Sequence, residues 1–271
     1  MTAMTDFSAT TVNRMPYDLA TIGTLWRRDL MRFLRQPSRV VGALGQPIIF
    51  WFVIGSGMAA SFRIPGSDVG YLSFFYPGVV TMVLLFASIF STVSVIEDRH
   101  QGFLQAVMAG PGSRAALVLG KCFGSASVAL LQVALFLLLA PAAGFSVFAI
   151  NWPLLLAMLV ITSLGLTALG VAMAWLLDNL QAFHAIQMTL LVPAWIVSGA
   201  MFPPSQSGAF SVVMRLNPLA YAVSGIRHAL YGGAAPGMTT VSSSPLVDLL
   251  VVGTFMVLSV AAAVTVCSRR S

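Results

Sequence analysis

Charged side chains are scarce in this sequence. Lys, Arg, Asp and Glu together make up 8% of its 271 residues, whereas 58% are hydrophobic. Soluble domains carry about 25% charged residues. So few charges cannot cover a water-facing surface of this size. The sequence therefore predicts an integral membrane protein.

Groups for catalysis, redox chemistry and metal binding are also few. Cys122 and Cys267 are too few for a disulfide framework. Gly120-Lys121-Cys122 resembles the end of a phosphate-binding loop, but Ala115 stands where the first glycine is needed and Cys122 replaces the required Ser or Thr. We expect no catalytic, cofactor-binding or metal-binding residue on this chain.

Histidines give no further chemistry. The sequence has no His-Glu-x-x-His motif, and its three histidines are scattered at His100, His184 and His228. The net charge of +6 does not indicate nucleic acid, because no basic stretch carries interleaved aromatics for base stacking. Contact with anionic lipid headgroups is the better interpretation.

Six apolar runs are about long enough to cross a bilayer as helices. They cover residues 40–61, 71–96, 115–141, 152–177, 183–202 and 245–267. A crossing helix needs about 20 apolar residues, and an open sheet would leave its backbone groups unsatisfied in lipid. The predicted fold is an all-α membrane protein whose six-span domain covers 40–267, after a flexible N-terminus at 1–16.

The basic residues predict the orientation. Eleven Lys and Arg residues fall on one side of the six spans and three on the other, which places both termini in the cytoplasm. No cleavable signal peptide is expected, because residues 1–39 are polar and the first long apolar run begins near Val40. The expected location is a bacterial plasma membrane.

Charge inside the membrane is expected to be minimal. On this topology Glu97, Asp98 and Asp178 lie at cytoplasmic ends of spans, and Asp248 lies near the outer start of the last span. Ion-coupled carriers usually place carboxylates or histidines at mid-membrane. An ion-driven mechanism therefore has little to use.

An amphipathic helix is predicted over 17–36, before the first span. Its apolar positions are Leu19, Ile22, Trp26, Leu30 and Phe33, and an arginine stripe lies roughly opposite, at Arg28, Arg32, Arg35 and Arg39. This pattern is typical of a helix at the membrane surface, and Pro37 ends it. The helix is either a simple anchor or a docking element for a protein partner.

The predicted cytoplasmic loop 97–114 is longer than a passive connection requires. Charged residues come first, then a short helix from Phe103 to Ala109, then a Gly-Pro-Gly breaker. Ser113 is placed to cap the third span. The alternative is an ordinary solvated loop.

The outer region 203–244 is expected to form a re-entrant or interfacial hairpin. Pro203 and Pro204 end the fifth span, and Asn217 with Pro218 opens a helix that reaches about Tyr231. At roughly 14 residues this helix is too short to cross the bilayer. The positive charge of Arg227 and His228 in its last turn suits the helix dipole, a structural role that alone explains them.

Three features in this order resemble the permease subunit of type-2 ATP-binding-cassette (ABC) exporters, closest to antibiotic-resistance and nodulation-factor exporter permeases. The first is the arginine-rich helix before the first span. The second is the segment Val95 to Gly102, followed by Pro111 to Arg114 and Gly120-Lys121. The third is Ser198 to Pro203, leading to Asn217 through Tyr221 and then Ile226-Arg227.

The resemblance implies a homodimer of permeases with two copies of a separate cytoplasmic ATPase, which would hold ATP and Mg²⁺. It also implies functional surfaces on this chain. The ATPase-coupling surface would comprise Arg28, Arg32, Arg35, Glu97, Asp98, Arg99, Gly102 and Phe103. The outer gate would comprise Pro203, Pro204, Asn217, Pro218, Tyr221 and Arg227.

The predicted function is therefore that of an exporter permease, a transport subunit without enzyme activity of its own. Its substrate would be hydrophobic or amphipathic: a drug, a lipid or a lipid-linked glycan. Two alternatives stay open at this stage. One is an ion-coupled or passive carrier, and the other is a membrane assembly factor that transports nothing.

Overall fold

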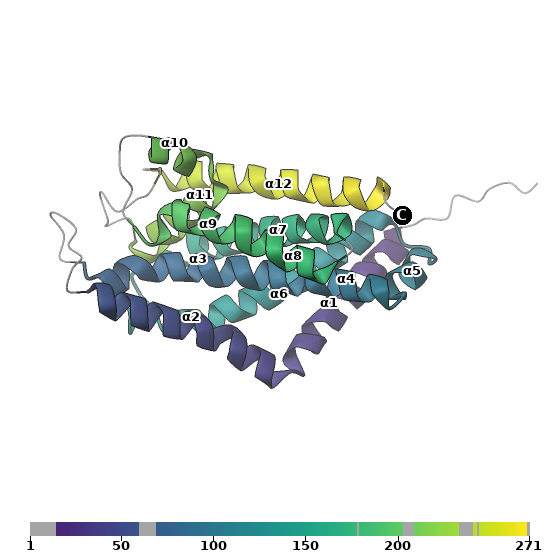
Figure 1. Cartoon of the computed structure of the whole chain (residues 1–271), viewed down its shortest axis with the longest axis horizontal. Coiled ribbons are helices and arrows are strands. Elements are labelled where there is room, and N and C mark those ends of the chain that lie inside the picture. Colours follow the sequence, from purple (N-terminus) through teal and green to yellow (C-terminus); the bar gives the residue numbers. More distant parts are fainter. Residues whose placement is uncertain are drawn as a thin grey trace, which may run out of the picture.

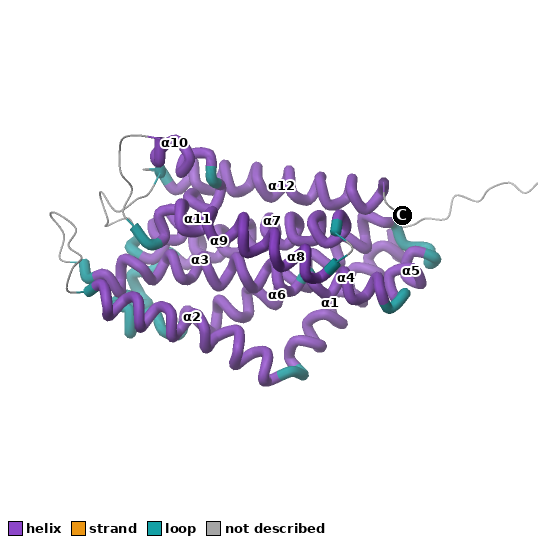
Figure 2. The backbone as a smooth tube through the Cα atoms, in the orientation of Figure 1, coloured by secondary structure: helices purple, strands orange, loops and turns teal. Residues whose placement is uncertain are grey.

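The computed structural model describes residues 15–59, 69–177, 179–202, 209–232, 241–242 and 244–269. Within these ranges all regular structure is helical, and six segments are long and apolar enough to cross a membrane. Figure 1 shows the long helices running side by side, and Figure 2 shows helices joined by short loops. The predicted all-α, six-span fold is confirmed.

The helices have the following bounds: α1 Met15–Leu34, α2 Pro37–Met58, α3 Tyr71–Ser91, α4 Val93–His100, α5 Phe103–Met108, α6 Arg114–Leu137, α7 Trp152–Leu176, α8 Leu180–Ile186, α9 Val192–Trp195, α10 Ala209–Leu216, α11 Pro218–Leu230 and α12 Pro245–Arg269. Two π-helical segments, η1 Gln187–Leu191 and η2 Ile196–Ala200, flank α9. The second span is α3 with α4, and the fifth runs from α8 to η2.

Two boundaries differ from the predicted ones. The start of the first span does not: helix α2 begins at Pro37, since proline suits the first turn of a helix, and the apolar span within it begins at Val41, next to the predicted residue 40. The third ends at Leu137 rather than 141, and turns with Gly144 at φ +90° follow. The second span continues through α4 to His100, so residues 97–100 of the predicted loop are helical.

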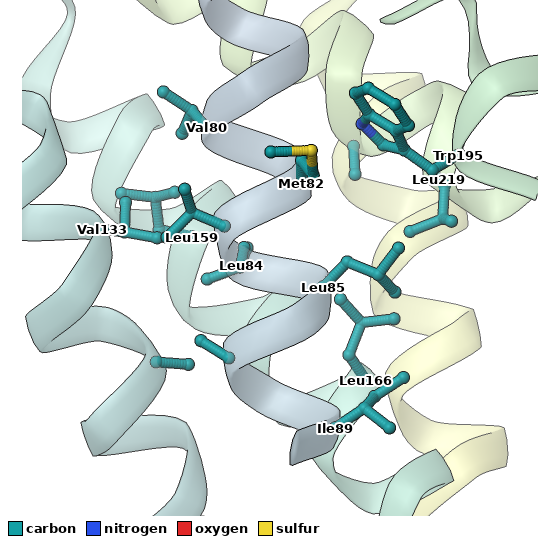
Figure 3. Close-up of a cluster of buried hydrophobic side chains, with 14 of the residues drawn as sticks. Val80, Met82, Leu84, Leu85, Ile89, Val133, Leu159, Leu166, Trp195 and Leu219 are labelled. Carbon is teal, nitrogen blue, oxygen red and sulfur yellow. The ribbon is translucent and has the colours of Figure 1, made fainter. Parts of the chain in front are cut away.

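The centre of the bundle is α3. Side chains from α6, α7, α9 and α11 surround it, and Val80, Leu84 and Leu85 are fully buried (Figure 3). By contrast, only about a fifth of the most apolar window of α2, of the fifth span and of α12 is buried. These three spans lie on the outside of the bundle, where their apolar side chains can face lipid.

Helix α1 packs along α6 and meets α2 at a sharp elbow that stands away from the bundle (Figure 1). Its protein-facing side is Leu25, Asp29 and Phe33, while Leu19 and Trp26 are largely exposed. The predicted helix is present, but the predicted apolar face was only partly right. Leu25 and Phe33 are buried, whereas the Trp26 indole, 41% exposed, donates a hydrogen bond of 2.9 Å to the Ser127 hydroxyl on α6.

The two ends of the bundle differ in content. Helix α5, the start of α6 and the C-terminal end of α12 lie at one end, which we call the α5 end (Figure 1). Arg114 at the start of α6 donates a hydrogen bond of 2.8 Å to the Ser268 carbonyl near the end of α12. Helices α10 and α11 lie at the other end, called the α11 end.

Candidate functional site

A cluster of charged side chains joins α1, α4 and α6 at the α5 end, and Asp98 of α4 is its centre. The Arg28 guanidinium donates two hydrogen bonds of 2.7 Å, one to each carboxylate oxygen of Asp98. The Lys121 ammonium lies 2.6 Å from Oδ2 of the same carboxylate. Two cations from different helices thus share one fully buried anion.

Lys121 also binds a second carboxylate. Its ammonium lies 3.1 Å from both oxygens of Asp29 on α1, and 3.4 Å from the Ser94 hydroxyl on α4. The lysine is fully buried, and Asp29 is 8% exposed. Buried charges are tolerated only when they are paired and hydrogen-bonded, and these partners meet that condition.

Arg32 and Glu97 form the more exposed edge of the ion cluster. The Arg32 guanidinium lies 3.6 Å from Glu97 and 3.7 Å from Asp98. The Phe103 ring packs against Arg28, with its centroid 3.9 Å from the guanidinium carbon. The ion cluster, defined as Arg28, Asp29, Arg32, Glu97, Asp98 and Lys121, therefore has three positive and three negative members.

Close packing of α1 on α6 brings these charges together. A side chain at Gly120 would meet the Leu25 Cβ at 3.1 Å, and one at Gly124 would meet the Asp29 Cβ at 3.0 Å. Small residues four apart let two helices approach closely. On α1, Asp29 and Leu25 are also four apart, so both point at the same face of α6.

The environment shifts the pKa values of two α1 members of the ion cluster, Arg28 and Asp29. The hydrogen bond from Arg28 to Asp98 raises the pKa of Arg28, although burial opposes this. Burial raises the pKa of Asp29, and the Lys121 ammonium lowers it by less. The charged form of Asp29 therefore depends on Lys121.

The other predicted coupling residues lie around the ion cluster rather than in it. Arg99 donates to the Leu177 carbonyl at 2.7 Å and so satisfies the end of α7. Gly102, at φ +73°, makes the turn between α4 and α5 that a residue with a side chain would strain. Arg35 is exposed on α1.

The predicted cap of the third span is confirmed. The Ser113 hydroxyl accepts from the Ala116 amide at 3.1 Å. The Ser113 amide in turn donates to Asp18 of α1 at 2.6 Å. The segment after α5 is therefore attached both to α6 and to the start of α1.

Charge is buried within the protein at both ends of the bundle, which the sequence did not predict. Asp29 and Asp98 at the α5 end, with Lys121 between them, are buried, and so are Arg227 and Asp248 at the α11 end. The linear sequence places each of these residues near the end of an element. The sequence did not indicate that helices distant in the chain pack over these side chains and bury them.

At the α11 end, Asn217 has two roles. Its side-chain oxygen accepts from the Leu219 amide at 3.0 Å, which confirms the predicted cap before Pro218. Its amide nitrogen donates to the Ala194 carbonyl in the fifth span at 2.5 Å. The Tyr221 hydroxyl donates to the Arg215 carbonyl at 3.1 Å. Pro203 and Pro204, also predicted here, lie outside the described residues.

Arg227 is turned into the protein rather than towards the end of its helix. It is fully buried and donates to the carbonyls of Phe74 on α3 and Gly199 in η2, both at 3.4 Å. Its guanidinium carbon lies 4.5 Å from the centroid of the Phe74 ring. Arg227 therefore joins α11 to the second and fifth spans, which the dipole explanation did not foresee.

A second polar contact ties α11 to α12. Asp248 of α12 is fully buried and accepts from the Ser224 hydroxyl at 2.9 Å, while His228 Nδ1 lies 3.0 Å from the same carboxylate oxygen. The sequence pointed to Asp248 and His228 separately but did not predict that they meet. The signal available was the acid in the first turn of an otherwise apolar span.

Comparison with known proteins gives a consistent family. Residues 20–231 match the ABC-2 type transporter family. That range includes the ion cluster and both predicted functional surfaces. It ends at Tyr231, directly after α11.

Curated relatives match over most of their length. Nodulation protein J of Rhizobium meliloti (strain 1021) is 27% identical over 77% of this chain and 80% of its own. A putative transport permease, ycf38, of Cyanophora paradoxa is 27% identical over 75% of this chain and 71% of its own length. The daunorubicin resistance ABC transporter permease protein DrrB1 of Streptomyces coeruleorubidus is 23% identical over 79% and 76%.

Proposed function

This chain belongs to the ABC-2 type transporter family, as a multi-pass permease subunit without a catalytic domain, and we propose that it forms the membrane path of an ATP-driven exporter. ABC-2 permeases pair with a separate nucleotide-binding ATPase, so the energy source lies on another chain. Family membership sets aside the ion-coupled carrier and the assembly factor. The proposed complex holds two copies of this permease and two of the ATPase.

The ion cluster carries the proposal. The predicted docking elements are α1 and the 97–114 segment, and the charges of α1 and α4 meet the transmembrane helix α6 at Asp98 and Lys121. If the ATPase pushes on α1 or α5, the ion cluster makes α3, α4 and α6 move together with them. Mechanical coupling of this kind lets closure of an ATPase dimer rearrange membrane helices.

The exposed side of α1 supports the docking role. A shallow groove there is lined by four arginines: Arg27, Arg28, Arg32 and Arg35. Of these, the exposed Arg27 and Arg35 lie outside the ion cluster and suit acidic side chains of a protein partner, because arginine binds carboxylates in a bidentate manner. The ATPase is the partner that we assign to it.

The proposed orientation puts the α5 end in the cytoplasm and the α11 end outside. The contact between Arg114 and the end of α12 supports a shared side for the start of α6 and the C-terminal end of α12. The excess of basic residues on that side favours the cytoplasm of a bacterial plasma membrane. Reporter fusions after Arg269 and within 203–208 would test the assignment.

At the outer end, we assign the gate to α11 and the segments that it contacts. Asn217 and Arg227 bind carbonyls of the fifth span, while Arg227 also binds the second. These contacts close the end of the bundle around Phe74 and Gly199. Rearrangement of the fifth span would break them and open a route outwards.

The decisive experiment is coupled ATP hydrolysis in vesicles that hold the permease and its cognate ATPase. Asp98→Asn keeps the side-chain shape but removes the charge that Arg28 and Lys121 share. We expect substrate-stimulated hydrolysis to fall about tenfold or more while the protein still inserts. Glu97→Gln, at a side chain that is 40% exposed, should have a smaller effect. Unchanged stimulation in Asp98→Asn would overturn the coupling role.

A hydrophobic or amphipathic substrate fits the apolar spans, and the curated relatives carry names linked to nodulation and daunorubicin resistance. Screening drugs, lipids and lipid-linked glycans for stimulated ATP hydrolysis would identify its class. A chain that exports only small ions would contradict this part of the proposal.

A further inference from the structure

A cavity of about 750 Å³ lies beside the ion cluster, within a single permease. Its walls come from α1, α2, α3, α4, α6, α8 and the fifth-span segment that follows α8. Drug-sized ligands occupy pockets of about 300–1,000 Å³. Asp29, Arg32 and Glu97 line one end of the cavity, so the cavity borders directly on the ion cluster.

One face of α6 leads from the ion cluster into this cavity. Lys121, Ser125 and Gln132 follow at helical spacing, and the last two line the cavity together with Val128. At 1.5 Å per residue, Gln132 lies about 16 Å along the helix from Lys121. Polar groups thus continue deep into an otherwise apolar span.

Unlike Lys121, the two polar side chains of α6 that line the cavity have no hydrogen-bond partner in the part of the chain that the structure describes. The Ser125 hydroxyl is buried and makes no hydrogen bond. Gln132 is 6% exposed, and its amide, which is not among the fully buried unpaired atoms, lines the cavity. A buried polar group left in this way costs free energy, which a ligand would recover by bonding to it.

The rest of the wall favours an aromatic ligand. Phe50 of α2 and Trp195 of α9 lie with ring centroids 5.9 Å apart, and Phe86 and Phe90 of α3 lie 5.8 Å apart. All four side chains line the cavity, as does the flexible Met188. Aromatic rings pack best against other rings in offset or edge-to-face arrangements.

We propose that this cavity binds a polycyclic aromatic molecule of drug size, whose hydroxyl, carbonyl or amine group is held by Gln132 and Ser125. The inference rests on the proposed transport function and adds to it a substrate class and the contacts that recognise it. Rings of the ligand lie among the four aromatic side chains. The ligand's polar group takes the hydrogen bonds that α6 leaves open. A lipid acyl chain, by contrast, would gain nothing from either polar side chain.

The test measures binding of rhodamine 6G to the purified permease in nanodiscs, by fluorescence polarisation, with empty nanodiscs subtracted. Gly42→Phe fills the cavity from α2, where a new Cβ meets nothing within 4 Å. Gly45→Phe is the matched control on the same helix, with equally open space but outside the cavity wall. We expect Gly42→Phe to abolish saturable binding and Gly45→Phe to retain it.

A second variant tests the polar contact. Gln132→Leu keeps the size of the side chain and removes its hydrogen bonds, so rhodamine 6G should bind about three- to tenfold more weakly. Wild-type protein without saturable binding, Gly42→Phe that binds normally, or Gln132→Leu with wild-type affinity would overturn the proposal. No ATPase is present in this assay, so a failure here is distinguishable from a failure of coupling.

Discussion

The two ends of this permease hold their helices together by different chemistry. At the α5 end, two buried carboxylates and a buried lysine are joined directly, and Arg28 adds a bidentate contact. At the α11 end, the buried Arg227 binds two carbonyl oxygens at 3.4 Å and the face of Phe74. The first arrangement is a balanced ionic joint. In the second, Arg227 contacts carbonyl oxygens and an aromatic face, and the Asp248–His228 contact lies apart from it.

This difference suggests at which end the helices separate during transport. Separating the ion cluster would expose opposite buried charges to an apolar surrounding, which is costly. Separating Arg227 from the carbonyls of Phe74 and Gly199 breaks long hydrogen bonds to neutral acceptors. The α5 end should therefore transmit motion as a unit, while the α11 end opens and closes.

The largest effect is expected for Lys121→Met. It leaves Asp29 and Asp98 buried without their shared cation, and breaking a buried pair in this way costs about 3–5 kcal/mol. Protonation of Asp29 would offset part of the loss, because its pKa is already raised by burial. Thermal unfolding in detergent measures the change, with the exposed Arg27→Met as control. Equal melting temperatures for the two variants would contradict a stabilising joint.

Arg227→Met should cost less, about 1–2 kcal/mol, because it leaves carbonyls rather than charges without a partner. The loss should concentrate at the α11 end. Hydrogen exchange would then rise in α11 and η2 while α1 and α4 keep their protection. Faster exchange at both ends would show that the two regions are not independent.

The smallest effect is expected for Ser224→Ala, about 1 kcal/mol, since it removes one hydrogen bond to Asp248 and leaves His228 in place. Chemical denaturation monitored by tryptophan fluorescence can resolve it. His228→Gln serves as the companion variant on the same carboxylate. A stabilised Ser224→Ala would mean that this hydroxyl has no net role in holding α11 to α12.

Local features of the sequence predicted the local structure well. The six apolar runs, the caps at Ser113 and Asn217, and the short helix after Gly102 all depend on neighbours within a few residues. The misjudged features depend on residues far apart in the chain. Asp29 and Lys121 are separated by 92 positions, and no periodicity predicts that they meet.

The same limit explains the error at Arg227. Its position in the last turn of α11 suggested a partner for the helix dipole. One of its carbonyl partners belongs to Gly199, at φ +78° in the π-helical η2, a distortion that apolar patterning does not report. The sequence indicated where the hairpin helix begins, but not what its charged side chain binds.

The most direct test of a rigid α5 end is to lock α1 to α6. A side chain at position 120 would place its Cβ 3.1 Å from that of Leu25, close enough for a disulfide in Leu25→Cys/Gly120→Cys after slight adjustment. If these helices move as one unit, oxidised permease in vesicles with its ATPase keeps substrate-stimulated hydrolysis near the reduced level. Loss of stimulation on oxidation, with recovery on reduction, would show that α1 and α6 must separate during transport and would contradict the account.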